Sequence, residues 1–573
     1  MLYYAVACDF DGTLAWNGHV HQATLDALVK LRASKRKIIL VTGRIVGELE
    51  QQFPHLALFD RIVAENGAVI YNPETGLSRT LGDPPPGRFI EDLRERQVHP
   101  VSVGEVIVAT WRPHQTTVLE TIEKYGLEHQ IIFNKGAVMV LPPGVNKATG
   151  LAEALADLQL SLRNTVCVGD AENDQAMFAA CETAVAVANA LVTVKQRADL
   201  TTHDHHGAGV AELISALLRD DLAAVKAKGS RHDVVIGWLI EGIPVYLRPR
   251  TVNVLLAGTS ASGKSRFAKG IIDRSGRNSY QSLVIDPEGD HEQIPSAIHL
   301  GNAGYAPDVD EIVAAVKGSQ QSVIANTLAM PAEERADFLN RLCTEIKDLR
   351  ITTGRPHRLV IDEAHQFLPA WKDLAGSEIA DIVAATFITV DPSQLSSGIV
   401  ETLDLVIGFG ADAAQCISLV AHRLHRAEIA IPNVTSGPEC AIAWWITSGD
   451  DPFRIIPAGC DLEHRRHHRK YAEGDMGPER SFYFRGPDGA TSLQAGSVAA
   501  FLELASSVSD ESWMFHLERH DFSTWISGSI GAPDLAAEVA VVEGDNRLSP
   551  EKSKVSIRKL LDEYFAPPVY YPL

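Results

Sequence analysis

Three apolar runs in the first 170 residues each end at a side chain that can bind a phosphate or a metal ion. The runs YYAVACD, KIILVT and TVCVGD end at Asp9, Thr42 and Asp170. Residues 22–33 have helical spacing, and this alternation of strand and helix favours a parallel sheet with helices on both faces. Ligands of such sheets bind beyond the carboxyl ends of the strands. We therefore expect the three side chains to meet at one edge.

Four short motifs lie in order around these strand ends. Each motif alone could be a turn or a helix cap, but four in order favour a catalytic interpretation. Hydrolysis of a phosphate ester needs a nucleophile, an acid or base for the leaving group, and cations that neutralise the phosphate. The motifs are Asp9-Phe10-Asp11-Gly12-Thr13, Thr42-Gly43-Arg44, Lys147 and Gly169-Asp170-Ala171-Glu172-Asn173-Asp174.

The motifs supply a residue for each of these tasks. Asp9 is the predicted nucleophile, which would form an aspartyl-phosphate, and Asp11 is the predicted acid and base. Gly12 permits the tight turn that lets both carboxylates point inward. Thr42 would donate a hydrogen bond to the phosphate, and Lys147 would pair with its charge. Because Mg²⁺ prefers oxygen ligands, the predicted metal ligands are Asp9, Asp11, Asp170 and Asp174.

Residues 82–144 interrupt the alternation of strand and helix. Pro84-Pro85-Pro86-Gly87 opens this segment and Pro142-Pro143-Gly144 closes it, since such runs break regular structure. We expect a small α/β cap inserted into a core made of residues 1–81 and 145–220. Its expected elements are a helix over 88–96, a strand over 105–111, a helix over 114–125 and a strand pair near 130–141.

A nucleotide-binding pattern begins after residue 250. The run Gly258-Thr259-Ser260-Ala261-Ser262-Gly263-Lys264-Ser265 fits GxxxxGK[ST], directly after an apolar strand and before a helical stretch. In that context the backbone N–H groups cradle the phosphates, Lys264 reaches the β- and γ-phosphates, and Ser265 holds Mg²⁺. The predicted nucleotide-binding residues are Gly258, Ser262, Gly263, Lys264, Ser265 and Asp362.

The run from Leu359 to His365 supplies the second half of this site. Asp362 would support the metal, and Glu363 would polarise a water molecule for attack. A glutamate here favours hydrolysis over transfer to a bound hydroxyl, so ATP and Mg²⁺ are the expected cofactors. The alternative is a glycine-rich turn and an unrelated buried strand; both halves occurring in context disfavour it.

Composition bounds the remaining organisation. A chain of 573 residues is too long for one core, and 45% hydrophobic with 22% charged residues fits a soluble globular protein. A charged helix near 210–228 leads to the linker Gly229-Ser230. The fold class expected is α/β: a doubly wound core with its cap, an α/β domain over 232–460, a basic linker over 461–478 and a small, mostly helical module over 479–573.

Net charge, cysteine spacing and the absence of evident targeting segments limit which partners and which compartment we expect. The net charge of −21 argues against a surface that clamps nucleic acid throughout. The basic run 464–470 could contact a phosphate backbone, although a solvated connector is favoured. Seven scattered cysteines without metal-ligand spacing, no evident signal peptide and no bilayer-length apolar stretch predict a cytoplasmic protein without a membrane partner.

Residues 1–218 resemble phosphatases of the haloacid dehalogenase superfamily, in the Cof-like subgroup. The run Glu65-Asn66-Gly67-Ala68 and the position of the cap carry the resemblance, and length and cap size are similar to archaeal phosphoglycolate phosphatases. The resemblance implies Mg²⁺-dependent hydrolysis of a small phosphate monoester whose identity the cap sets. Candidate substrate contacts are Arg44, Asn66, Arg112 and His114, the last two being more readily explained as solvated cap residues.

Residues from about 232 to 460 resemble ATPases of the HerA/FtsK type. The supporting runs are VIDPEGD at 284–290 and DEAHQFLP at 362–369. The resemblance implies a homo-oligomeric ring, with a hexamer expected and DNA as a candidate partner. Val390 stands where that family has a sensor glutamine, which puts the coupling of hydrolysis to movement in doubt. Arg423 and Arg426 are candidate arginine fingers, or ordinary surface arginines.

The combined prediction is a Mg²⁺-dependent phosphatase fused to an oligomeric ATPase. Two alternatives stay open. One is a metabolic enzyme whose P-loop half is a small-molecule kinase, which Glu363 argues against. The other is a phosphatase joined to a scaffold that ATP gates, which Val390 favours.

Overall fold

The computed structural model of the chain forms two compact units, Met1–Ala458 and Gly459–Leu573. Within the first unit we call residues 1–220 the first lobe and residues 232–458 the second lobe. No helix among the described residues is long and apolar enough to cross a membrane. The structure describes residues 1–227, 229–259, 262–291, 294, 296–371, 382–426, 429–432, 441–459, 481–485, 493–530, 533–545 and 547–565.

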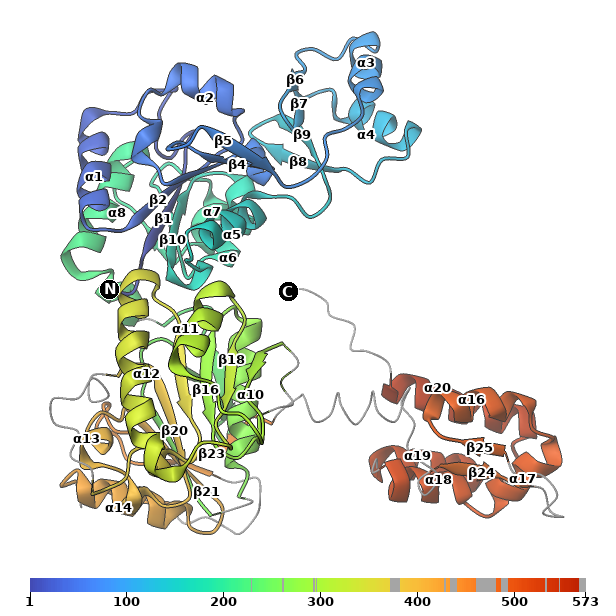
Figure 1. The fold of residues 1–573 in the computed structure, drawn as a ribbon. Coiled ribbons are helices and arrows are strands. Elements are labelled where there is room, and N and C mark those ends of the chain that lie inside the picture. The colour runs from blue at the N-terminus through green and yellow to red at the C-terminus, as the bar shows by residue number, and fades with distance from the viewer. Residues whose placement is uncertain are drawn as a thin grey trace. The chain divides into compact units, whose positions relative to one another are not determined.

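The first lobe is built on an eight-stranded sheet in the order β12-β11-β10-β1-β2-β3-β4-β5 (Figure 1). Its central strand β1 pairs in parallel with β10 and with β2. These strands are buried almost throughout because both faces of the sheet are covered. The strands are β1 (Ala5–Asp9), β2 (Lys37–Val41), β3 (Arg61–Ala64), β4 (Val69–Asn72), β5 (Leu77–Thr80), β10 (Thr165–Gly169), β11 (Thr183–Ala186) and β12 (Leu200–Thr201).

Helices cover this sheet on both sides, as the alternating pattern predicts. Helix α1 packs against α8, and α5 packs against α6. The single helix expected near 210–228 is wrong: α8 ends at Asp220, and Asp221 and Leu222 take φ of 55° and 57°, a left-handed conformation that interrupts a helix. The helices are α1 (Gln22–Ala33), α2 (Val46–Gln52), α5 (Lys147–Asp157), α6 (Gln175–Ala180), α7 (Val192–Arg197) and α8 (His206–Asp220). Helix α9 (Ala223–Ala227) follows the lobe in sequence.

The cap is a four-stranded antiparallel sheet in the order β6-β7-β9-β8 with two helices. The expected strand pair near 130–141 is the hairpin β8–β9. Its connection is Lys135-Gly136, and both residues have positive φ, 48° and 91°, as two-residue hairpin turns of type I′ require. The elements are α3 (Gly87–Glu95), β6 (Ser102–Val103), β7 (Val108–Trp111), α4 (Gln115–Lys124), β8 (Gln130–Asn134) and β9 (Ala137–Leu141).

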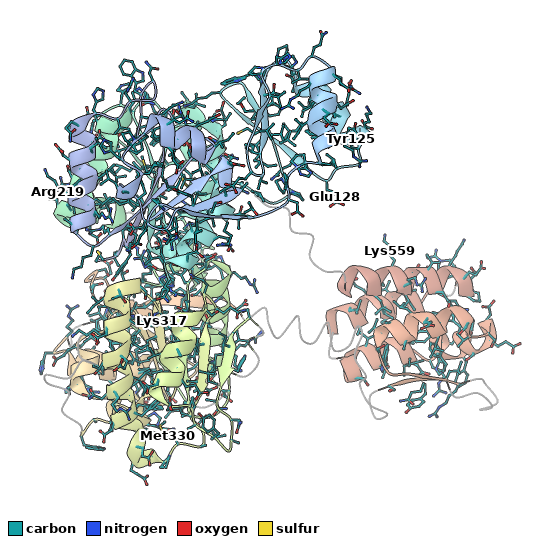
Figure 2. The ribbon with its side chains drawn as sticks, turned by 45° about the horizontal axis from the view of Figure 1, so that its top comes forward. Tyr125, Glu128, Arg219, Lys317, Met330 and Lys559 are labelled. Atoms are coloured by element: carbon teal, nitrogen blue, oxygen red, sulfur yellow. The ribbon has the colours of Figure 1, made fainter. Side chains whose placement is uncertain are left out.

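The second lobe contains an eleven-stranded sheet in the order β14-β13-β23-β22-β21-β15-β20-β19-β16-β18-β17. The strands from β21 to β17 are parallel, and β22, β23, β13 and β14 extend the sheet in antiparallel pairing. Figure 2 adds the side chains to the ribbon and labels Lys317 and Met330 in this lobe. The mixed pairing gives an α/β lobe with a parallel core and an antiparallel edge.

The elements of the second lobe are β13 (Val234–Trp238), β14 (Pro244–Leu247), β15 (Val254–Ala257), α10 (Lys264–Arg277), β16 (Ser282–Asp286), β17 (Ile298–Leu300), α11 (Val309–Gly318), β18 (Val323–Asn326), α12 (Ala332–Thr353), β19 (Arg358–Ile361), β20 (Ala385–Thr389), α13 (Ser397–Val400), β21 (Leu405–Phe409), α14 (Ala413–Arg423), β22 (Ala441–Trp445) and β23 (Phe453–Pro457).

Buried polar groups join the two lobes. Tyr280 donates its hydroxyl hydrogen to Glu182 at 2.9 Å. The His357 ring lies 2.9 Å from Ser161 Oγ and 3.0 Å from Asn164 Oδ1. Burial lowers the pKa of His357 well below its usual value. Such satisfied buried networks specify one packing of the parts they connect.

The second unit is helical around a two-stranded antiparallel sheet. An aromatic cluster fills its core, including Phe482, Phe501 and Trp513. The basic linker predicted over 461–478 lies outside the described residues. The elements are β24 (Phe482–Phe484), β25 (Leu493–Ala495), α16 (Val498–Ser507), α17 (Asp510–Glu518), α18 (Asp521–Trp525), α19 (Pro533–Glu543) and α20 (Pro550–Phe565).

Candidate functional site

Three buried carboxylates meet at one edge of the first sheet. Asp9 ends β1, Asp170 directly follows β10, and Asp174 lies in the short 3₁₀ turn after it. One carboxylate oxygen from each of the three lies within 4.8 Å of those of the other two. We call these residues the carboxylate cluster. The parallel pairing of β1 with β10 is what brings Asp9 and Asp170 to the same edge, as the strand-end argument expects.

Lys147 lies between two members of this cluster. Its ammonium is 2.6 Å from Asp9 Oδ1 and 2.6 Å from Asp174 Oδ1, and its side chain is 1% exposed. Burial, and then the Asp174 carboxylate, raise the pKa of Asp9. Burial lowers the pKa of Lys147, but Asp174 and Asp9 outweigh it, so that pKa is raised. The ammonium therefore keeps its charge among the carboxylates.

Two threonines border the cluster. Thr42 is buried, and its Oγ1 accepts the backbone N–H of Arg44 at 3.1 Å. Thr13 donates its hydroxyl hydrogen to Asp170 Oδ1 at 3.3 Å. Sequence reasoning assigned Thr42 a role but gave none to Thr13, although Thr13 completes the first motif.

Asp11 is not a member of the carboxylate cluster. Arg44 binds both of its carboxylate oxygens, through Nε and Nη2 at 2.6 Å each, and the Asp11 side chain is 45% exposed. The backbone carbonyl oxygen of Asp11, in contrast, accepts a hydrogen bond from the Lys135 ammonium, which also contacts Asp170. The predicted metal ligand Asp11 thus reaches the neighbourhood of the cluster through its carbonyl oxygen and not through its carboxylate.

Lys135 was missed in the sequence, and it comes from the cap. Its Nζ lies 2.7 Å from Asp170 Oδ2 and 3.0 Å from the carbonyl oxygen of Asp11. Of the other cap candidates, Arg112 adjoins the same hairpin, since its backbone N–H donates to the Gly136 carbonyl oxygen at 3.0 Å and its guanidinium lies over the Phe133 ring. His114 immediately precedes α4. A lysine at a two-residue hairpin turn is the one sequence signal that could have pointed to Lys135.

The loop after β3 ties the cluster to the cap. Three consecutive residues have positive φ: Glu65 (50°), Asn66 (56°) and Gly67 (110°). Buried Glu65 accepts the backbone N–H groups of residues 105, 106 and 107 in the cap, each at 2.8 Å. Asn66 Oδ1 accepts a hydrogen bond from Asn173 at 2.9 Å. Asn66, a predicted substrate contact, is thus bound to the loop that carries Asp174.

The cluster has the donor set for a divalent cation. Three carboxylates suit a hard ion such as Mg²⁺. Gly12 has φ of +91°, and a β-carbon there would lie 2.5 Å from Asp170 Oδ2. A side chain at position 12 would therefore collide with this oxygen and with the Lys135 ammonium that contacts it.

The glycine-rich loop of the second lobe lies between β15 and α10. Lys264 donates hydrogen bonds to the carbonyl oxygens of Gly258 at 2.6 Å and Thr259 at 2.8 Å. Gly258 and Gly263 have φ of 153° and 102°, which a side chain would disfavour. The Ser262 hydroxyl is buried without a hydrogen-bond partner. Ser265 lies in the first turn of α10, and residues 260–261 lie outside the described part of the chain.

Asp362 and Glu363 follow β19, and the negative charges of both carboxylates act on the Lys264 ammonium. Asp362 Oδ2 lies 2.9 Å from His291 Nε2, and Asp362, His291 and Asp286 form a second buried cluster of ligand atoms within 4.8 Å. Burial, and next the Asp362 carboxylate, raise the pKa of Glu363 to about 7. Glu363 has φ of 43°, a strained conformation typical of functional positions. His291 was missed by sequence reasoning.

The two arginines considered as fingers contact their own chain. Arg423 donates to the carbonyl oxygens of Pro392 and Leu395, both at 2.7 Å. Arg426 donates to the carbonyl oxygen of Ile446 at 2.5 Å. Both guanidinium groups therefore support loops of the second lobe in this structure.

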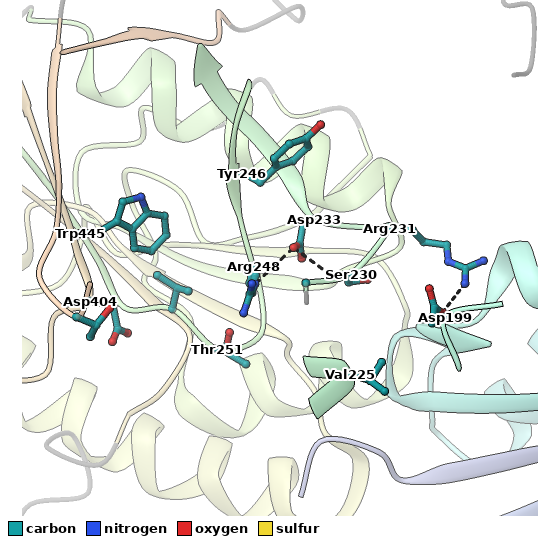
Figure 3. Close-up of a pocket in the computed structure, with 13 residues that line it drawn as sticks. Asp199, Val225, Ser230, Arg231, Asp233, Tyr246, Arg248, Thr251, Asp404 and Trp445 are labelled. Atoms are coloured by element: carbon teal, nitrogen blue, oxygen red, sulfur yellow. Dashed lines mark hydrogen bonds and ion pairs between the residues drawn. The ribbon is translucent and has the colours of Figure 1, made fainter. Parts of the chain in front are cut away.

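One cleft lies away from both sets of predicted site residues. It has a volume of about 830 Å³ and a lining that includes Asp199, Arg231, Asp233, Arg248 and Trp445 (Figure 3). Asp233 pairs with Arg248 at 3.6 Å, and Arg231 pairs with Asp199. Paired charges of both signs indicate a solvated junction between the lobes more than a substrate pocket.

Known proteins match the first lobe. Residues 6–116 and 119–214 match the family described as haloacid dehalogenase-like hydrolase. A phosphoglycolate phosphatase of Methanothermobacter thermautotrophicus is 30% identical over 222 residues, which cover 96% of that protein and 37% of this chain. This chain belongs to the haloacid dehalogenase-like hydrolases. Its first lobe is the part that carries the membership.

Two further relatives agree. Phosphoglycolate phosphatase 2 of Saccharolobus solfataricus is 29% identical over 218 residues, covering 91% of that protein and 37% of this chain. A phosphoglycolate phosphatase of Haloarcula marismortui is 30% identical over 220 residues, covering 94% of that protein and 36% of this chain. The first lobe of this hydrolase is therefore a phosphatase of the superfamily, whose members use Mg²⁺, and its carboxylate cluster suits that ion.

Proposed function

We propose that the first lobe hydrolyses a small phosphate monoester through an aspartyl-phosphate on Asp9, and that the ester carries a carboxylate, as 2-phosphoglycolate does. The observation that carries the proposal is the buried ammonium of Lys147, 2.6 Å from both Asp9 and Asp174. This ammonium holds one carboxylate oxygen of Asp9 in place, and its positive charge offsets the negative charges of the two carboxylates. The names of the relatives point to the ester.

In this mechanism the residues divide the work. A carboxylate oxygen of Asp9 attacks phosphorus, and the bond from phosphorus to the ester oxygen breaks. Arg44 holds both carboxylate oxygens of Asp11 in this structure, so Asp11 must first leave Arg44. It then gives its proton to that leaving oxygen and later removes a proton from the water that hydrolyses the aspartyl-phosphate. Thr42 and Lys147 bind the phosphoryl oxygens. A bound Mg²⁺, held by Asp9 and Asp170 with Asp174 in support, would neutralise the phosphate charge.

The test is phosphate release from 2-phosphoglycolate with Mg²⁺. Asp9→Asn keeps the shape of the side chain but removes the nucleophile, so we expect a loss of at least about 10³-fold in kcat. Asp26→Asn is the matched control, because Asp26 is exposed on α1. Equal rates for wild-type and Asp9→Asn protein would refute the mechanism.

We propose in addition that the second lobe binds and hydrolyses ATP. Support comes from the glycine-rich loop at the start of α10 and from the strained, half-buried Glu363 beside Asp362. Lys264→Ala should lose affinity for ATP, whereas Glu363→Gln should bind ATP and not hydrolyse it. Glu345→Gln, an exposed position on α12, is the control. Hydrolysis at the wild-type rate by Glu363→Gln would contradict the role of Glu363.

The same assay separates the alternatives. Phosphate release from ATP that rises with DNA supports a motor, and release that requires a small hydroxyl acceptor supports a kinase. ATP binding without release supports a scaffold that ATP gates.

Assembly into a homo-oligomeric ring, with six subunits expected, belongs to this second proposal. One head-to-tail contact repeated around an axis closes such a ring. Light scattering on Glu363→Gln protein with ATP and Mg²⁺ measures the assembly. A strict monomer under those conditions would overturn it, and full ATPase activity in the Arg423→Ala/Arg426→Ala double variant would exclude both arginines as fingers.

A further inference from the structure

The cap reaches the carboxylate cluster through the tip of its β8–β9 hairpin. Asn134 and Ala137 pair across the turn, so Lys135 stands at the outermost point of the hairpin. Its ammonium contacts Asp170 Oδ2 at 2.7 Å and the Asp11 carbonyl oxygen at 3.0 Å. The Lys135 side chain is still 42% exposed, so one side of the ammonium faces open space.

The cap also approaches the core at two places besides Lys135. Glu65 binds three backbone N–H groups of the cap, and the sulfur of cap residue Met139 lies 3.7 Å from where a β-carbon of Gly43 would stand. Gly43 belongs to the second motif. The cap that carries Lys135 is thus attached to the core by more than the ion pair of Lys135.

The oxygen that Lys135 binds is also a candidate metal ligand. A divalent cation on Asp170 would compete with the ammonium for Oδ2, since two cations on one carboxylate oxygen repel each other strongly. Lys135 would then need another anionic partner within reach of its flexible four-carbon stem. Two other cations of the site already have carboxylate partners in this structure: Arg44 pairs with Asp11, and Lys147 pairs with Asp9.

We propose that Lys135 selects phosphate esters whose leaving group carries a carboxylate, and that its ammonium exchanges Asp170 for that carboxylate when the cation binds. The proposal rests on the proposed phosphatase function. A carboxylate on the ester would accept a charge-assisted hydrogen bond from Lys135 in place of the one that Lys135 loses from Asp170. The competing role is a latch, in which Lys135 only holds the cap against the core and never touches the substrate.

The variants are Lys135→Met, which keeps length without charge, and Lys135→Arg, which keeps charge. Lys30→Met, exposed on α1, is the control. Steady-state kinetics are measured with 2-phosphoglycolate and with p-nitrophenyl phosphate, which has no carboxylate. We expect Lys135→Met to raise KM for 2-phosphoglycolate about ten- to a hundredfold, the worth of a hydrogen bond between charged groups, and to change kcat/KM for p-nitrophenyl phosphate less than about threefold. Lys135→Arg should restore most of the loss.

A second readout does not depend on turnover. Mn²⁺ binding, followed by its electron paramagnetic resonance signal without substrate, should be about tenfold tighter in Lys135→Met, because the competing ammonium is gone.

The outcomes separate the two roles. Equal losses on both esters with unchanged Mn²⁺ affinity would establish the latch and overturn the proposal. A wild-type chain that cleaves neither ester would refute the proposed phosphatase function, and with it the selection of the ester, while the Mn²⁺ measurement would still decide whether Lys135 competes for the cation site.

Discussion

Replacing Lys147 by methionine should destabilise the first lobe severely. The side chains of Lys147, Asp9 and Asp174 are 1%, 7% and 0% exposed, so the variant leaves two buried carboxylates without their shared cation. Breaking such a pair costs about 3 to 5 kcal/mol. Asp174 keeps the backbone N–H groups of Asp170 and Ala171, both at 2.9 Å, so most of the cost falls on Asp9.

Amide hydrogen exchange in β1 and β10 measures this loss, because core strands report the unfolding free energy of their own lobe. Without divalent cations at pH 7.5, protection should fall roughly a hundred- to several thousandfold, the equivalent of that free energy. The penalty should be smaller at pH 5.5. Burial already raises the pKa of Asp9, and protonation removes the charge that Lys147 no longer balances.

The double variant Lys147→Met/Asp9→Asn is the decisive companion. It removes the uncompensated charge, so it should recover about 1 to 3 kcal/mol relative to Lys147→Met. Unchanged protection in Lys147→Met, or no recovery in the double variant, would refute the claim that Lys147 acts by balancing buried charge.

Three further changes test other parts of the chain. Glu65→Gln should cost about 1 to 3 kcal/mol, because an amide group must face one of the backbone N–H donors, and faster exchange of the three cap amides that Glu65 binds would show it. Gly67→Ala should lower the unfolding free energy by about 3 kcal/mol or more, since its β-carbon would lie 2.0 Å from the Asn146 carbonyl oxygen. Gly47→Ala is the control, because a β-carbon there would have nothing within 4 Å, and calorimetry should show it to be neutral or stabilising. Burial raises the pKa of Asp233 from 3.8 to about 6, so the folded chain holds a proton there that the unfolded chain loses, and stability falls as pH rises through that interval. Asp233→Asn should flatten this fall in unfolding temperature between pH 4 and pH 7, and an unchanged slope would contradict the assignment.

Sequence reasoning reached the parallel sheet of the first lobe and the meeting of Asp9 with Asp170. Each residue follows an apolar run long enough for one buried strand, and parallel neighbours end at the same edge. The cap hairpin was also accessible, because breaks at Pro-rich runs and alternation within them are local signals. The kink after Asp220 was not, since nothing local distinguishes Asp221 and Leu222 from helical residues.

Tertiary structure alone decided which charges face one another. Lys135 lies 35 residues from Asp170 and 124 from Asp11 in sequence, and its contact depends on how the cap docks on the core. Arg44 draws the Asp11 carboxylate away from the cluster in which the sequence pattern had placed it.

The physical reason is the range over which each signal acts. Hydrophobic period, turn residues and motif spacing operate within a few residues, so the sequence by itself determined the strands, the order of the lobes and the chemistry available at the strand ends. Other pairings depend on how segments far apart in the chain pack together: Lys135 with Asp170, His291 with Asp362, and Tyr280 with Glu182. These long-range contacts exist only in the folded structure.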